Sequence, residues 1–325
     1  MESPSFDELD LRLLQALQLD GRAPFSRIAA VLGVSDQTVA RRFRRLYADG
    51  GLRVLGVADA ARLGRTSWLL RLRCAPDAAD PIARALARRP DTKWIGLTSG
   101  GTEVLCVAEP RTRDDHTALL LGKLPRTPRI LEISALCLLH TFYGGPLGWF
   151  AKGEGLTAAE VEALTPPPVD PFTGPLTLDA EDERLIDALG RDGRATYPEL
   201  QQLTGLSESA AKRRLEQLRR SGALFIDVQF EADQIGYLAH AVLWLTVRPS
   251  ALSAVGRALA EHGEVAFACA TTGPSNIFAV VLCRDTADLY RYLSERIGAL
   301  DGVQHVETAP TLRRIKSLAY EERRR

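Results

Sequence analysis

A duplicated segment constrains this chain more than any other feature of its sequence. Residues 33–50 read GVSDQTVARRFRRLYADG, and residues 205–222 read GLSESAAKRRLEQLRRSG. The motif Asp-Gly-Arg-Ala at residues 20–23 returns at the same spacing, at residues 192–195. Similarity at one fixed spacing indicates a repeated structural unit. The chain of 325 residues is therefore predicted to contain two copies of one unit.

The first copy of the segment predicts a sharp turn followed by a helix with two unlike faces. Gly33 suits a turn with positive φ, and Ser35 stands where a helix N-cap belongs. Gly50 is expected to end the helix. The apolar stripe of this helix consists of Val39, Phe43 and Leu46.

The opposite face of each repeated helix carries residue types that contact DNA. Arginine and glutamine read base edges in the major groove, and arginine and lysine hold phosphates. The DNA-binding candidates of the first copy are Ser35, Gln37, Thr38, Arg41, Arg42 and Arg45. Those of the second copy are Ser207, Ser209, Lys212, Arg213 and Arg214. A single helix of this kind is equally typical of a solvated basic surface. Two short predicted helices before it, at residues 7–19 and 25–32, favour a helix-turn-helix.

The two copies differ on this face. Thr38 is replaced by Ala210, Arg44 by Glu216 and Arg45 by Gln217. The two helices are therefore not expected to read the same bases, and the second is expected mainly to grip phosphate.

The second part of each unit changes from helical periodicity to alternation of apolar and polar residues. In the first unit we expect strands at 67–73, 92–98, 103–108 and 130–139, and helices at 80–89 and 114–123. In the second we expect strands at 238–247, 265–271, 277–282 and 303–312, and helices at 252–261 and 287–297. The order βαββαβ is that of a ferredoxin-like module. The predicted fold class is α+β, with a winged-type helix-turn-helix domain followed by a βαββαβ effector module, twice.

Domain limits follow from these changes of pattern. A stretch with five prolines at residues 165–175 excludes regular structure, and Thr157 is expected to cap a short helix before it. The predicted domains are residues 1–60, 61–145, 146–176 (a linker), 177–232 and 233–318. A sheet covered by helices on one face must bury its other face. We therefore expect the two βαββαβ modules to pair within the chain, and the chain to associate further with copies of itself.

Charge and cysteine usage exclude several other classes of protein. The 41 basic and 41 acidic residues balance. A basic surface that binds nucleic acid must therefore be confined to one region, such as the two repeated helices. The five cysteines are odd in number and form no Cys-x-x-Cys motif, which indicates buried thiols in a reducing compartment rather than disulfides or zinc. The N-terminus has no signal-peptide character, and no apolar run is long enough to span a membrane. We expect a cytoplasmic protein.

In sequence the chain resembles the Lrp/AsnC family of transcriptional regulators. The match lies in the helix-turn-helix halves, in the Leu-Asp-x-x-Leu-Leu run at residues 9–14, Asp-Gly-Arg at 20–22, Leu-Gly-Val-Ser at 32–35 and the basic run at 39–46. The resemblance implies a tandem variant that binds double-stranded promoter DNA and responds to a small molecule, usually an amino acid. It also implies a bacterial, nucleoid-associated protein.

The resemblance also implies an effector site at the turn between the second and third strands of each module. The residues placed there are Thr98, Gly100, Gly101 and Glu103, and then Thr271, Thr272, Gly273, Ser275 and Asn276. The family's aspartate in this turn is Glu103 in one copy and Asn276 in the other. A carboxylate and an amide treat an ammonium group differently, so the two turns are not expected to bind the same ligand equally. The alternative is that the glycines only make hairpins.

Enzyme chemistry has little support in the sequence. The five histidines are scattered, no phosphate-binding loop is present, and no catalytic residue, metal or cofactor is predicted. The alternative from the same fold is a sirohaem decarboxylase, whose family carries histidine and aromatic residues around this hairpin. The hairpins here, residues 94–104 and 267–277, contain no His, Arg or Tyr. A sensor that does not bind DNA is the third alternative, suggested by Glu216.

Overall fold

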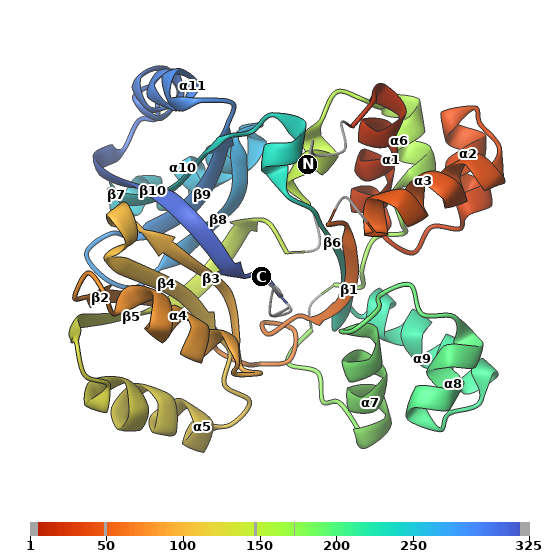
Figure 1. Cartoon of the computed structure of the whole chain (residues 1–325), viewed down its shortest axis with the longest axis horizontal. Helices are drawn as coiled ribbons and strands as arrows, with labels where there is room; N and C mark the ends of the chain where they lie inside the picture. The colour runs from red at the N-terminus through yellow and green to blue at the C-terminus, as the bar shows by residue number, and fades with distance from the viewer. Residues whose placement is uncertain (1–5, 49–50, 146–147, 172, 319–325) are drawn as a thin grey trace. The chain divides into compact units, whose positions relative to one another are not determined.

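The computed structural model describes residues 6–48, 51–145, 148–171 and 173–318. Gly50, the expected end of the helix that follows the first repeated turn, lies outside these residues. The chain divides into two compact units. The helical unit consists of residues 1–64 and 144–237, and the sheet unit of residues 65–143 and 238–325. Each unit therefore contains one part of both sequence repeats (Figure 1).

The helical unit holds two three-helix modules of the same design. The first module comprises α1 (Glu8–Leu19), α2 (Phe25–Leu32), α3 (Asp36–Ala48) and β1 (Arg53–Ala58). The second comprises α7 (Ala180–Leu189), α8 (Tyr197–Thr204), α9 (Glu208–Arg220), β6 (Leu224–Gln229) and the short turn η5 (Ala232–Ile235). Asp7 begins α1 through a capping box with Asp10, and Gly33 ends α2 in the left-handed conformation at φ 68°. The predicted helix-turn-helix order is confirmed in both modules.

The strand after the third helix of each module pairs with its counterpart in the other. β1 and β6 run antiparallel as a two-stranded sheet, with Arg53 opposite Gln229 and Val57 opposite Phe225. The repeated spacing makes Arg53 equivalent to Phe225, so this register relates the two modules by an approximate twofold rotation. The ribbon thereby fixes the two modules against each other.

The repeated Asp-Gly-Arg-Ala motif forms the second contact between the two modules. Each arginine donates to the carbonyl oxygens of the glycine and the alanine of the other motif, at 2.6 and 3.0 Å in both directions: Arg22 to Gly193 and Ala195, and Arg194 to Gly21 and Ala23. A Cβ on Gly21 would lie 2.6 Å from the side chain of Ile226. The motif therefore requires glycine for close approach, and its arginines join the modules.

Part of the predicted linker belongs to the first module. η4 (Trp149–Lys152) and α6 (Ala158–Leu164) pack against α1 and α2 (Figure 1). Thr157 caps α6 as predicted, and Glu160 of α6 pairs with Arg12 at 2.6 Å. Leu164 is fully buried in the core of the first module.

The sheet unit contains two βαββαβ modules, as predicted. The first comprises β2 (Trp68–Cys74), α4 (Ala79–Ala87), β3 (Thr92–Thr98), η1 (Ser99–Gly101), β4 (Glu103–Ala108), α5 (Arg113–Thr117), η2 (Ala118–Lys123), η3 (Leu124–Arg126) and β5 (Ile130–Tyr143). The second comprises β7 (Ala239–Val247), η6 (Pro249–Ala251), α10 (Leu252–Glu261), β8 (Val265–Thr271), β9 (Ile277–Cys283), α11 (Thr286–Arg291), η7 (Tyr292–Ile297) and β10 (Val303–Lys316).

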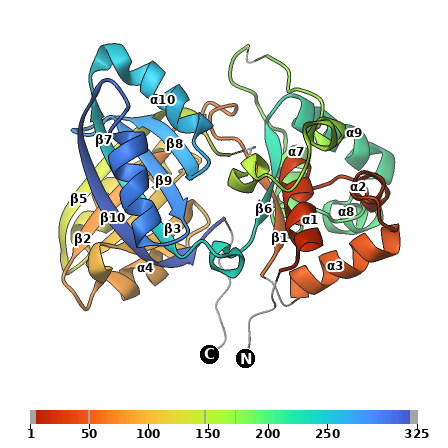
Figure 2. The ribbon, with the colours of Figure 1, turned by 90° about the horizontal axis from the view of Figure 1, so that it is seen from above.

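The two four-stranded sheets join into one closed barrel in the order β10-β3-β4-β2-β5-β8-β9-β7 (Figures 1 and 2). A cluster of buried apolar residues from both modules, including Leu69, Leu105, Trp244 and Phe278, fills the space between the sheets. The expected pairing of the two modules within the chain is confirmed. Further cores lie beneath the helices of each module.

The last strand of each module extends beyond its predicted end. β5 was expected to stop at residue 139 and β10 at residue 312, but they reach Tyr143 and Lys316. The added residues pair with an edge strand of the other module, β5 with β8 and β10 with β3. Partner strands distant in sequence thus set these ends, which local patterns could not reveal.

Candidate nucleic-acid interface

The start of each third helix is fixed by the predicted cap. The Ser35 hydroxyl accepts a hydrogen bond from the Thr38 amide at 3.2 Å, and the Ser207 hydroxyl accepts one from the Ala210 amide at 3.3 Å. Ser35 also lies 3.0 Å from the Thr38 hydroxyl. The hydroxyls of Ser35, Thr38 and Ser207 therefore use part of their hydrogen-bonding capacity to hold the turn before the helix.

The outward side of α3 carries three exposed polar residues at helical spacing. Val39 and Leu46 are buried against the module core, so positions 37, 41 and 44 point away from it. Gln37, Arg41 and Arg44 are all exposed and form what we call the first reading face. The described part of the chain offers Arg41 no ion-pair partner. Arg44 uses Nε within the helix, donating to the carbonyl of Ala40 at 3.2 Å.

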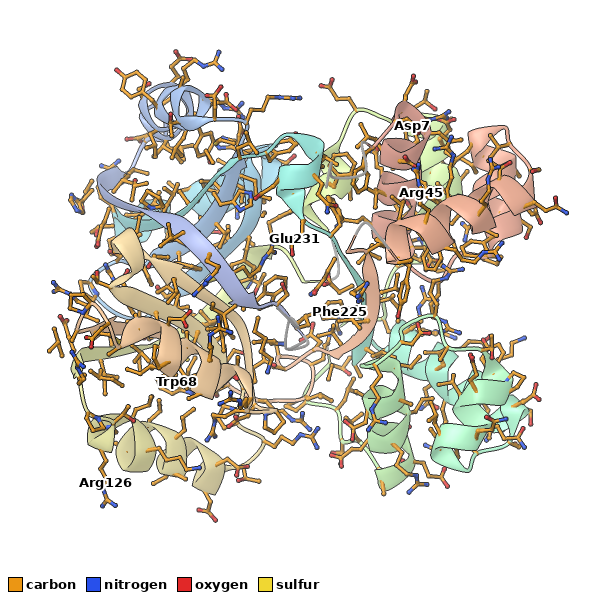
Figure 3. The ribbon with its side chains drawn as sticks, viewed as in Figure 1. Asp7, Arg45, Trp68, Arg126, Phe225 and Glu231 are labelled. Carbon is orange, nitrogen blue, oxygen red and sulfur yellow. The ribbon has the colours of Figure 1, made fainter. Side chains whose placement is uncertain are left out.

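Two other arginines of α3 face α1 instead. Arg42 donates to Asp7 at 2.6 Å and to Asp10 at 2.9 Å, and Arg45 also forms an ion pair with Asp10. Figure 3 labels Asp7, the residue that caps α1, and Arg45 of α3. Asp10 is fully buried, so these arginines compensate a carboxylate removed from water. The hydrogen bond with Asp7 raises the pKa of Arg42, and the same bond lowers the pKa of Asp7.

The second module repeats this contact. Arg214 of α9 donates to Asp179 and Asp182 of the α7 start, each at 2.8 Å, and also pairs with Glu181. Arg42 and Arg214 occupy equivalent positions, 172 residues apart in sequence. Both were predicted to touch DNA, yet both bind the start of the first helix of their own module. Their geometry is that of residues that hold the third helix in place.

The outward side of α9 differs in charge from that of α3. Ser209, Arg213 and Glu216 are exposed at the positions equivalent to Gln37, Arg41 and Arg44. We call these three residues the second reading face. Within the described ranges neither Arg213 nor Glu216 has an ion-pair partner, and Lys212 lies exposed beside them.

The candidate effector turn of the first βαββαβ module contains a buried carboxylate. Glu103 is 2% exposed and accepts hydrogen bonds from Thr98 at 2.9 Å, Ser99 at 3.1 Å and Arg71 at 2.5 Å. Arg71 also pairs with Glu307 of the second module and lies 4.9 Å above the ring of Trp244. The hydrogen bonds that Arg71 donates to Glu307 and Glu103 raise its pKa. The predicted turn residue Glu103 is therefore part of a contact between the two modules.

The equivalent turn of the second module forms hydrogen bonds both within its own module and with β5 of the first. Asn276 accepts from the amide of Val247 at 2.9 Å and donates to its carbonyl at 2.8 Å. Thr271 donates to the carbonyl of Ser275, and Thr272 accepts from the amide of Cys137 at 2.9 Å.

The glycines of both turns have positive φ, as hairpin turns require. They are Gly100 at 68°, Gly101 at 86° and Gly273 at 108°. The two turns are alike in backbone and unlike in chemistry.

Comparison with known proteins agrees with this arrangement. Residues 6–47 and 178–219 both match the AsnC-type helix-turn-helix domain, and residues 240–319 match the Lrp/AsnC ligand binding domain. The chain belongs to the Lrp/AsnC family. It is a tandem-duplicated, Lrp/AsnC-type transcriptional regulator, with two helix-turn-helix domains in one chain.

Two curated Lrp/AsnC-type relatives are single-unit proteins. The HTH-type transcriptional regulator LrpA of Pyrococcus abyssi is 29% identical over 140 residues, which are 43% of this chain and 99% of that protein. The HTH-type transcriptional regulator FL11 of Pyrococcus horikoshii is 29% identical over 138 residues, 42% of this chain and 90% of that protein.

A solved structure shares the tandem architecture. The crystal structure of the siroheme decarboxylase NirDL matches with a TM-score of 0.62 at 18% identity, over 97% of this chain and 94% of that one. At this identity the likeness concerns the fold alone.

Sequence reasoning missed three features of this Lrp/AsnC chain. Arg44 belongs to the first reading face, which its spacing of seven from Gln37 could have indicated. Arg71 binds the turn residue Glu103 and joins the two βαββαβ modules. The role of Arg22 and Arg194 had no local signal, because each binds a loop more than 170 residues away.

Other classes of site find little support in the described ranges. These ranges contain no group of three or more His, Cys, Asp or Glu side chains placed to hold a metal ion. All five cysteines are free thiols, four of them buried and Cys137 half-buried. None of the described helices combines the length and apolar character that crossing a lipid bilayer requires.

Proposed function

We propose that the chain binds double-stranded DNA in a sequence-specific manner through the third helices of both modules. The first reading face carries the proposal: an arginine with no ion-pair partner among the described residues, a second arginine and a glutamine project from a helix whose other side is buried. These are the side chains that contact base edges and phosphates in the major groove. The contact between β1 and β6 supports simultaneous use of both helices, because it fixes the two modules in one pair.

The geometry revises which residues we assign to DNA. We propose Gln37, Arg41 and Arg44 for the first module, and Ser209, Lys212 and Arg213 for the second. We assign Arg42, Arg45 and Arg214 to positioning, because their guanidinium groups are bound to acids of the first helix. The hydroxyls of Ser35, Thr38 and Ser207 hold the helix start and offer DNA only their remaining hydrogen-bonding capacity.

Salt-dependent binding to genomic operator fragments tests this assignment. Arg41→Ala should weaken binding and reduce the slope of log affinity against log salt by about one, because one phosphate or base contact is lost. Arg257→Ala removes an equal charge from an exposed position on α10 and is the matched control. Equal affinity of Arg41→Ala and wild type at every salt concentration would overturn the assignment of α3.

We propose further that the sheet unit binds a small, amino-acid-like effector. The ligand-binding-domain match at residues 240–319 supports this for the second module. In the first module an ammonium group would compete with Arg71 for Glu103, whereas the second module offers a neutral amide. The second turn, with Thr271, Thr272, Gly273, Ser275 and Asn276, is therefore the better candidate for a ligand that does not displace an ion pair.

A thermal-shift screen of the twenty amino acids tests effector binding. A ligand that binds only the folded state should raise the melting temperature. Ser275→Ala should reduce the shift if the second turn is used, and Thr98→Val should reduce it if the first turn is used. No shift with any amino acid at millimolar concentration would leave both turns as plain hairpins.

A tetrapyrrole-binding enzyme is the alternative to be tested, since the NirDL likeness spans 97% of the chain. The hairpins at 94–104 and 267–277 carry no His, Arg or Tyr to handle such a ligand. We propose that the chain is a regulator and not an enzyme. A Soret band with a shifted maximum on addition of an iron tetrapyrrole would contradict this.

We propose that the chain also associates with further copies of itself and with the bacterial nucleoid. Light scattering coupled to size exclusion would give the mass of the assembly, and a mass of one chain at micromolar concentration would contradict self-association. Fluorescence microscopy of a tagged chain would test its co-localisation with DNA.

A further inference from the structure

The two reading faces are held in equivalent positions but are chemically unlike. The helical unit relates its two modules by an approximate twofold rotation, through the register of β1 against β6 and the reciprocal bonds of Arg22 and Arg194. Symmetric pairs of helix-turn-helix modules read two copies of one half-site in inverted orientation. Two modules with different outward residues are not expected to read two copies of the same half-site.

The difference is concentrated at one exposed position. The first reading face presents Arg44 one turn beyond Arg41, and the second presents Glu216 one turn beyond Arg213. Both positions lie opposite the buried side of their helix, which is Leu46 in α3 and Leu215 with Leu218 in α9. Nothing in the described chain neutralises Glu216, so its carboxylate is available outward.

The chemistry of a carboxylate at this position is selective. A glutamate is repelled by phosphates, so it adds nothing to nonspecific binding. It accepts a hydrogen bond from the N4 amino group of cytosine, whereas an arginine pairs with O6 and N7 of guanine or with phosphate. An arginine and a glutamate at equivalent positions therefore demand different base pairs.

We propose that Glu216 is a specificity-determining residue that selects cytosine in the second half-site. The chain consequently reads an operator with two unlike half-sites and binds it in one orientation only. This inference rests on the proposed DNA-binding function. It adds that each of the two helices selects its own sequence.

Selection of binding sites from random DNA by the full-length chain tests the inference. The wild type should select two unlike half-sites. Glu216→Gln, which keeps the size of the side chain, should lower discrimination for cytosine at one position of one half-site by roughly 5- to 100-fold. Glu216→Arg should make the two half-sites more alike, and Arg44→Glu should introduce cytosine into the other half-site.

The outcomes separate this inference from the proposed function. Selection of a perfect inverted repeat by the wild type, or unchanged base preferences in Glu216→Gln, would overturn the inference while DNA binding stands. Absence of any DNA binding by the wild type would overturn both. A merely structural role of Glu216, such as support of α9 through Lys212, would change the melting temperature of the variants and leave the selected bases unchanged.

Discussion

The two helix-turn-helix modules share their internal contacts and differ on the surface that faces outward. Arg42 and Arg214 both bind acids at the start of the first helix, and the same capping boxes begin both helices. Outward, an arginine in the first module stands where the second has a glutamate. The residues that hold the third helix in place are therefore separate from those that we propose to contact DNA.

The modules also differ in how their cores are completed. Helix α6 covers one side of the first module, and the second module has no corresponding helix among its described residues. Val31 on α2 is partly buried in the core to which α6 contributes, whereas Leu203, its equivalent on α8, is 55% exposed. The first module is thus expected to depend on α6 for part of its core.

The largest expected effect comes from breaking this dependence. Leu164→Ala removes a fully buried side chain of α6 and should destabilise the helical unit by about 2–5 kcal/mol through lost burial and the cavity left behind. Urea unfolding followed by circular dichroism measures the change. Leu203→Ala, on the exposed side of α8, is the control and should change the free energy of unfolding little. Equal effects of the two substitutions would mean that α6 adds nothing to the first module.

The shared ion pairs give a second, smaller contrast. Asp10→Asn should cost about 2 kcal/mol, because Asp10 is fully buried and holds both Arg42 and Arg45. Asp182→Asn should cost less, because Asp182 is 16% exposed and Arg214 keeps Asp179 and Glu181. The same urea titration compares them. A larger loss for Asp182→Asn would reverse the ranking.

The next smaller expected effect is on DNA affinity, which substitutions in the two modules should lower by different amounts. Arg41→Ala is expected to weaken operator binding by about tenfold, which is about 1.4 kcal/mol. Arg213→Ala should have a smaller effect, because the neighbouring Glu216 already opposes phosphate binding on that face. Fluorescence anisotropy with a labelled operator measures both. A stronger loss for Arg213→Ala would assign the main grip on DNA to the second module.

Acid should produce the smallest effect, and it should be similar in both modules. The hydrogen bond from Arg42 lowers the pKa of Asp7, and the backbone hydrogen bond of Asp182 lowers that of Asp179. A carboxyl with a lowered pKa in the folded state adds stability above its unfolded pKa, which is about 3.9. That stability is lost as the pH falls through the folded pKa. Melting temperatures recorded between pH 6 and pH 3 should therefore decrease once the pH is lower than about 4. The decrease should be less steep in Asp7→Asn than in the wild type.

Local sequence patterns were sufficient for the helices and for the order of strands. Residues 25–32 were predicted as a helix, and α2 has these bounds. The signals for this helix, apolar residues at helical spacing and the glycine at residue 33, lie within one short segment. The βαββαβ order followed from the change of period in the same way. Burial of the open sheet faces was also foreseeable, since apolar strand faces require a partner.

Contacts between distant segments could not be read from such patterns. Arg42 forms ion pairs with residues 32 and 35 positions away in the sequence. The sequence of a basic helix does not indicate which of its arginines form such pairs. The extension of β5 beyond Leu139 depends on β8, more than 120 residues later. The bond between Arg71 and Glu103 likewise joins positions 32 apart, so no local pattern indicates it.

The reciprocal bonds between the Asp-Gly-Arg-Ala motifs have a consequence for how the protein behaves at low abundance. Two helix-turn-helix modules on separate chains would have to meet by diffusion, and such pairing is lost on dilution. Here the second reader is always present at the high effective concentration that covalent linkage provides. Burial lowers the pKa of Arg194 to about 10, which still leaves it charged at neutral pH to keep its loop engaged. If both third helices bind DNA as we propose, a few molecules per cell suffice to occupy both halves of an operator together.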